Sequence, residues 1–198
     1  MSKGEATRER IVDRALQLAT RDGLGGLSIG SLAEDLGLSK SGLFAHFGSK
    51  EDLQVEVLRS AVERFRSRVI LEALRAPRGR PRVEKLFELW LRWGQDPTMP
   101  GGCIFMAAAF ELDDHPGPVR DYLVAMQQQF VAALEQAVRL AIAEGHFRAG
   151  VNPENVAFDQ FGILFAYSYA KRLHGDAQAE TRARASFQRL MDWAATPN

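Results

Sequence analysis

Apolar residues recur along this chain at the three- and four-residue spacing of an α-helix, and no stretch alternates long enough to predict a strand. In the first segment the apolar positions are Ile11, Ala15, Leu18 and Ala19, and Gly23 follows as a stop. A much longer segment begins after Ser49 and carries apolar residues at Leu53, Val57, Ala61, Phe65 and Val69. The pattern predicts an all-α protein of about nine helices, over residues 5–22, 28–36, 39–47, 49–75, 82–96, 101–113, 117–145, 153–173 and 178–195.

Two of the predicted helices are short and lie close together. Ser28 is placed to cap the first of them, Gly37 ends it, and Ser39 is placed to cap the second. Two helices joined by such a turn make a helix-turn-helix over about residues 28–47. Leu43 and Phe47 are the buried pair of its second helix.

The remaining side chains at the start of this second helix are expected to point outward: Lys40, Ser41, Phe44 and Ala45. In DNA-binding helix-turn-helix proteins, residues at this position reach base edges in the major groove. Ser28, Ser39 and Lys50 stand near helix N-termini, where backbone N–H groups favour phosphate. A surface helical hairpin with satisfied caps fits the same pattern, so the spacing alone leaves both interpretations open.

Composition restricts how any nucleic acid could be bound. The chain has 198 residues, a formal net charge of +0 and a pI near 6.9, so DNA binding would depend on local patches rather than on a global field. The N-terminal stretch lacks the apolar run of a signal peptide, and the apolar stretches CIFMAAAF and FGILFAY are too short to span a membrane. The single cysteine, Cys103, suits a reducing compartment and is expected to be a buried, inert thiol. A soluble cytoplasmic protein is predicted.

Two short motifs suggest other chemistry. Residues 26–30 read G-x-S-x-G, as in serine hydrolases, but a helix precedes them where that motif needs a strand. Glu111 and His115 are four residues apart with two aspartates between them, which a helix-ending loop explains more simply than a metal site. We therefore expect no catalytic residues, no metal and no cofactor.

Residues of about 8–58, above all LSIGSLAEDLGLSKSGLFAHFGSKEDL, resemble the DNA-binding domain of the tetracycline-repressor (TetR) family of transcriptional regulators. The resemblance implies a DNA-reading domain over residues 1–50 and an effector-binding and dimerisation domain over residues 51–198. Phe44 departs from the family's usual tyrosine, which removes a hydroxyl contact to phosphate, and Gly42 stands where a hydroxyl residue is common. The family's phosphate and base contacts carry over to Ser28, Ser39, Lys40, Ser41, Phe44, His46 and Lys50.

Beyond residue 50 the sequence is less specific. The family resemblance implies an effector pocket between the later helices, although a packed core is the simpler reading of any single aromatic residue there. The helix over 153–173 is apolar nearly all round, which predicts that a partner covers one of its sides, together with the helix over 178–195. The candidate pocket residues are Trp90, Trp93, Phe105, Met106, Phe110, Met126, Phe130, Phe161, Phe165 and Tyr169.

These observations lead to a functional hypothesis. The chain is expected to be a homodimeric regulator that binds a pseudo-palindromic DNA operator, most simply a repressor released by a small apolar or aromatic effector. The alternatives are an all-α ligand carrier or enzyme with an incidental helical hairpin, and a pure dimerisation module.

Overall fold

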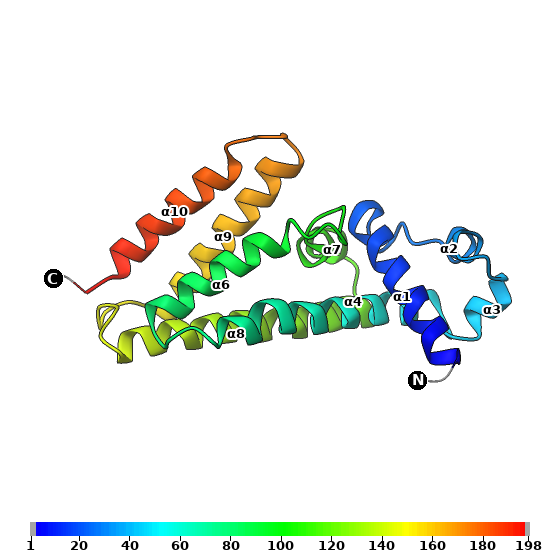
Figure 1. Cartoon of the computed structure of the whole chain (residues 1–198), viewed down its shortest axis with the longest axis horizontal. Coiled ribbons are helices and arrows are strands. Elements are labelled where there is room, and N and C mark those ends of the chain that lie inside the picture. The colour runs from blue at the N-terminus through cyan, green and yellow to red at the C-terminus, as the bar shows by residue number, and fades with distance from the viewer. Residues whose placement is uncertain (1–2, 197–198) are drawn as a thin grey trace. The chain divides into compact units, whose positions relative to one another are not determined.

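The computed structural model describes residues 3–196, and across them the chain is helical with no β-strand (Figure 1). The α-helices α4 and α5 are joined without a break by the π-helical turn η1, so counting them as one gives nine helices in the described residues. The all-α prediction is confirmed, and most boundaries lie within a few residues of those expected. The elements are α1 (Lys3–Asp22), α2 (Ile29–Asp35), α3 (Lys40–Phe44), α4 (Lys50–Phe65), η1 (Arg66–Ile70), α5 (Leu71–Ala73), α6 (Arg80–Trp93), α7 (Ile104–Leu112), α8 (Pro118–Ala143), α9 (Pro153–Arg172) and α10 (Ala179–Ala194).

Backbone contacts divide the chain into two compact units. Unit 1 comprises Met1–Phe65 and Gln95–Gln127, and unit 2 comprises Arg66–Gly94 and Gln128–Asn198. The helices α1 to α3 therefore share a unit with α7 and the first part of α8. This is a division by packing; the functional division expected at residue 50 stays a prediction.

The core of unit 1 forms where α1 and α4 pack together. All five predicted core positions of the long helix, from Leu53 to Val69, are buried, the first four of them in unit 1. In α1 the prediction holds for Ile11, Ala15 and Ala19, whereas Leu18 is only half-buried and Leu16 is completely buried. Because Val12 and Leu16 are buried as well, the covered stripe of α1 is displaced from the predicted one. Cys103, just before α7, is buried as expected.

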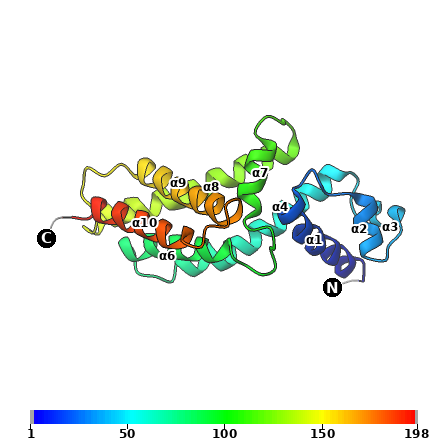
Figure 2. The same cartoon turned by 90° about the horizontal axis from the view of Figure 1, so that it is seen from above.

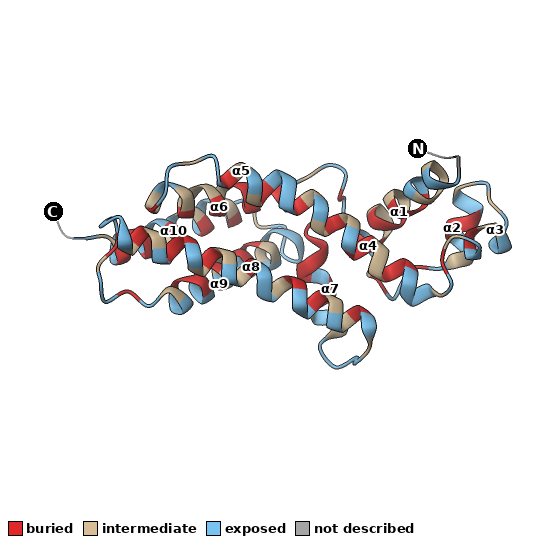
Figure 3. Cartoon of the chain, turned by 90° about the horizontal axis from the view of Figure 1, so that it is seen from below, coloured by how far each residue is buried: buried red, intermediate tan, exposed pale blue. Residues whose placement is uncertain are grey.

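Unit 2 contains α6, α9 and α10. Figures 1 and 2 both show α9 and α10 side by side, joined by a short loop. Phe87 of α6 stacks on Phe187 of α10 with ring centroids 3.8 Å apart, which fixes one face of α10 against α6. Figure 3 shows buried residues along one side of α9 and α10 and exposed residues along another. None of the described helices is long and apolar enough to cross a lipid bilayer.

Candidate nucleic-acid interface

The helix-turn-helix forms from local signals in the sequence. The Ser28 hydroxyl accepts a hydrogen bond from the Ser31 N–H, and the Ser39 hydroxyl accepts one from the Gly42 N–H at 3.0 Å, so both predicted N-caps are confirmed. Gly37 ends α2 with a φ of 66°, which a residue with a side chain rarely adopts. Its N–H and that of Leu38 bond back to carbonyls of α2, the glycine-dependent Schellman arrangement at helix C-termini.

The second helix of the motif, α3, is shorter than predicted. It ends at Phe44, because His46 N–H bonds to the Leu43 carbonyl and Phe47 N–H to the Phe44 carbonyl, a spacing of three that tightens the chain into a turn. Leu43 and Phe47 are nevertheless both buried, as expected. The turn carries Phe47 back to the core although it lies outside the helix.

The structure gathers several of the predicted DNA contacts at one place. Ser28, Ser39, Lys40, Ser41, Phe44 and Lys50 are exposed, and His46 is half-buried. The Ser39 and Ser41 hydroxyls lie 3.1 Å apart. A Cβ built on Gly30 would lie 3.1 Å from Lys40 Cε and 3.7 Å from Ser28 Oγ, so Lys40 extends over the start of α2 beside Ser28. Their role in binding DNA stays a prediction.

Lys50 has a hydrogen-bond partner within the protein. Its ammonium group donates a hydrogen bond to the Gly25 carbonyl, with an Nζ–O distance of 2.6 Å. Lys50 therefore holds the loop that precedes α2 in this structure. The sequence did not predict this contact, because 25 residues separate the two groups.

An ion pair fixes the far end of α2 to α1. The Arg14 guanidinium donates two hydrogen bonds to the Asp35 carboxylate, at 2.6 and 2.9 Å. The hydrogen bond from Arg14 is the main cause that holds the pKa of Asp35 below its usual value, and the charge of Arg14 adds to it. Both side chains are partly exposed, so the pair orients the helices more than it stabilises them.

Two polar residues that were not predicted as site residues also hold the loop that precedes α2. Gln54 is buried and donates from Nε2 to the Leu24 carbonyl at 2.7 Å. Glu111, considered above only as a possible metal ligand, accepts hydrogen bonds from the N–H groups of Leu24 and Gly25. Within residues 3–196, no three His, Cys, Asp or Glu side chains gather as metal ligands would. In the sequence, the only signs of this contact are an acidic residue late in α7, Glu111, and the glycines after α1. Neither of them shows that the two segments meet.

The candidate effector-pocket residues are divided between the two units. Phe105, Met106, Phe110 and Met126 belong to unit 1, and the other six to unit 2. In unit 2, Trp90 meets the edges of Phe130 and Phe161, with centroid distances of 6.3 and 4.9 Å. Phe110 and Tyr169 are 72% and 60% exposed, so in this structure they face outward. The assignment of these ten residues to a pocket stays a prediction.

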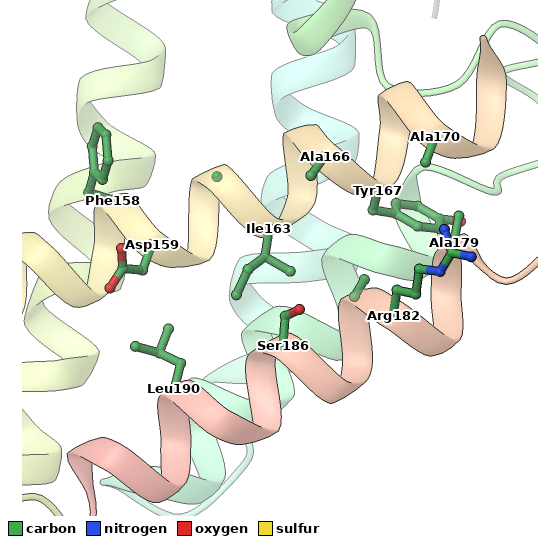
Figure 4. Close-up of a pocket in the computed structure, with 12 residues that line it drawn as sticks. Phe158, Asp159, Ile163, Ala166, Tyr167, Ala170, Ala179, Arg182, Ser186 and Leu190 are labelled. Atoms are coloured by element: carbon green, nitrogen blue, oxygen red, sulfur yellow. The ribbon is translucent and has the colours of Figure 1, made fainter. Parts of the chain in front are cut away.

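A groove runs between α9 and α10 in unit 2. It has a volume of about 530 Å³, and Figure 4 shows Ile163 reaching from α9 towards α10 and Leu190 reaching back from α10. Phe158, at one end of the groove, is 79% exposed. The lining is mainly apolar, with Asp159, Arg182 and Ser186 as its polar members.

The sequence matches two protein families, which cover different parts of it. Residues 11–57 match the family described as bacterial regulatory proteins, tetR family, and residues 79–187 match the tetracyclin repressor-like C-terminal domain. A nucleoid occlusion factor, SlmA, from Marinobacter nauticus is 25% identical over 150 residues, which are 76% of this chain and 73% of that protein.

Solved structures share the fold over nearly the whole chain. A TetR transcriptional regulator from Chloroflexus aurantiacus is 24% identical, with a TM-score of 0.86 over 98% of this chain and 96% of that one. AibR, solved in complex with isovaleryl coenzyme A and operator DNA, is 20% identical, with a TM-score of 0.76 over 93% of this chain and 97% of that one. The two family matches, which include the helix-turn-helix and more than half of the chain, show that this protein belongs to the tetracycline-repressor family of DNA-binding transcriptional regulators.

Proposed function

We propose that this protein is a homodimeric repressor that leaves its operator when a small apolar or aromatic effector binds. The observation that carries the DNA-binding part is the exposed group of Ser28, Ser39, Lys40 and Ser41 at the adjoining ends of α2 and α3. These side chains offer hydroxyl and ammonium donors at the starts of α2 and α3, where they are exposed, and the major groove admits an α-helix. Phe44 beside them is 47% exposed and supplies an apolar contact for a sugar or a thymine methyl group.

The operator experiment starts from a pool of genomic fragments. Purified protein should enrich a pseudo-palindrome, because two reading heads related by a two-fold axis meet two half-sites. Binding to the enriched duplex is then compared with binding to a scrambled duplex across a range of salt concentrations. Equal affinity for the two duplexes would contradict sequence-specific regulation.

The groove of α9 and α10 supports the homodimer. Phe158 of α9 and Leu173, which directly follows α9, are large apolar residues that lie mostly exposed in the single chain. A second copy of the same two helices would cover them and fill the groove beside Ile163 and Leu190, forming a contact between identical surfaces. A homodimer would carry two reading heads, one for each half-site of a pseudo-palindrome.

An effector is supported by the aromatic residues of unit 2. Trp90, Phe130, Phe161 and Phe165 form a connected group of rings, which suits an apolar or aromatic ligand. AibR, the similar protein above, was solved with both a small molecule and operator DNA. A ligand screen by thermal shift, followed by operator binding with each hit, tests this part: a ligand that stabilises the protein without changing its DNA affinity would not be the effector.

A further inference from the structure

The loop between α1 and α2 is held by side chains on both sides. The Glu111 carboxylate accepts hydrogen bonds from the backbone N–H groups of Leu24, at 2.8 Å, and of Gly25. The carbonyls of the same two residues accept hydrogen bonds from Gln54 Nε2, at 2.7 Å, and from Lys50 Nζ, at 2.6 Å. All four polar backbone groups of two consecutive loop residues are therefore bound by side chains from α4 and α7.

Glycines let α7 approach this loop and the end of α1 closely. A Cβ on Gly25 would lie only 2.6 Å from Glu111 Oε1, so the carboxylate occupies the space that a side chain would need. Before α7 begins, the Gly101 N–H donates to the Thr20 hydroxyl at 3.1 Å, and a Cβ on Gly101 would lie 1.5 Å from the Thr20 carbonyl oxygen. The segment from Gly101 to Glu111 thus contacts α1 at its start and the loop at its end.

We propose that Glu111 is a positioning residue for DNA binding, an inference that rests on the function proposed above for α2 and α3. The loop that it holds reaches Ser28, the N-cap of α2, three residues after Gly25. The same loop supplies the carbonyl that binds the Lys50 ammonium. By fixing the two N–H groups, Glu111 sets where α2 begins and where Lys50 lies, without touching DNA itself.

Because Glu111 is negatively charged, its positioning role and its electrostatic repulsion of DNA predict opposite changes in operator affinity. A carboxylate near a DNA-binding surface repels the phosphate backbone, so its neutralisation alone would leave the affinity unchanged or raise it. A charge-assisted hydrogen bond to two backbone N–H groups is strong, and its loss would loosen the loop. The positioning role therefore predicts a change of the opposite sign, a fall in operator affinity.

The first experiment replaces Glu111 by glutamine in the full chain. Glu111→Gln keeps the shape but leaves one of the two N–H groups facing an amide instead of a carboxylate oxygen. The matched control is Asp114→Asn, which removes the same charge from the exposed loop after α7. Glu111→Gln should weaken operator binding about tenfold, and Asp114→Asn should leave it unchanged or slightly tighter.

Hydrogen exchange of the Leu24 and Gly25 amides reports the contact directly. In the wild-type protein both amides should exchange slowly, and in Glu111→Gln they should exchange at least tenfold faster while the core of α4 keeps its protection. A second variant, Gly25→Ala, disturbs the contact from the other side, because its methyl group displaces the carboxylate while the charge stays. It should also weaken operator binding, and combined with Glu111→Gln it should add little.

The outcomes separate the two proposals. A wild-type protein with no preference for any duplex would contradict the proposed function itself. A wild-type protein that binds its operator, with Glu111→Gln binding as tightly as Asp114→Asn, would overturn the positioning role, whatever the exchange rates. Weaker binding with unchanged exchange at Leu24 and Gly25 would overturn it as well, because Glu111 would then act by another route.

Discussion

Gln160 of α9 carries a buried carboxamide whose removal should stabilise the protein. The residue is 0% exposed, and neither Nε2 nor Oε1 has a hydrogen-bond partner among the described residues. A buried polar group without a partner costs about 1–3 kcal/mol, so the two groups together cost about 2–6 kcal/mol. Gln160→Leu removes both groups with a similar volume, and imperfect fit of the new side chain costs up to about 1.5 kcal/mol. A net gain of about 2 kcal/mol in the free energy of unfolding is expected.

The assay is thermal unfolding at one fixed protein concentration. For a chain of 198 residues, 1 kcal/mol moves Tm by about 2–4 °C, so Gln160→Leu should raise Tm by about 4–8 °C. The matched control is Gln54→Leu. Gln54 is also buried, but its Nε2 donates to the Leu24 carbonyl, so the same substitution there should lower Tm.

The two glutamines give a clear contrast. If Gln160→Leu lowers Tm as Gln54→Leu does, the amide of Gln160 has a favourable partner in solution, such as an ordered water, and the reasoning is refuted. If Tm rises, the natural protein keeps a destabilising amide inside α9.

The remaining predictions concern DNA, assembly and pH. Lys40→Ala should cost about 1–3 kcal/mol of operator affinity and reduce the sequence preference at one base position, measured by anisotropy titrations. Lys50→Ala should weaken binding to all duplexes alike and reduce the slope of log affinity against log salt concentration by about 1, in the same titrations. Phe158→Arg should raise the dimer dissociation constant about 100-fold or more, because it buries an unpaired charge in the proposed contact, and light scattering measures this. The control Leu74→Arg changes an exposed leucine outside α9 and α10 and should stay dimeric. Asp35→Asn should lower the urea midpoint at pH 7. The difference from the wild-type protein should shrink in acid, because the hydrogen bond from Arg14 lowers the folded-state pKa of Asp35 and its contribution is lost as the pH falls through that pKa.

Much of the fold was predictable because its signals are local. Ser28, Gly37 and Ser39 act on backbone groups within five residues, so the helix-turn-helix could be placed from the sequence. Every predicted core position of α4 is buried, because a helix covered along one side keeps a simple period of three and four residues, although Gln54 and Leu58 are buried as well and were not predicted. Leu18 was predicted as a core position where the structure buries Leu16 instead, since the direction from which neighbours cover α1 is decided only when the helices pack.

The contacts around the candidate site depended on the tertiary structure. Glu111 and Gly25 are 86 residues apart, and Lys50 and Gly25 are 25 apart, so no spacing rule connects them. Nor did the sequence indicate that the amide of Gln160 would be fully buried without a hydrogen-bond partner among the described residues. A sequence pattern reports which groups each helix presents, because hydrogen bonding and periodicity act within a few residues. Which of those groups meet is decided by the packing of whole helices, and that packing depends on the sum of many weak contacts between distant parts of the chain.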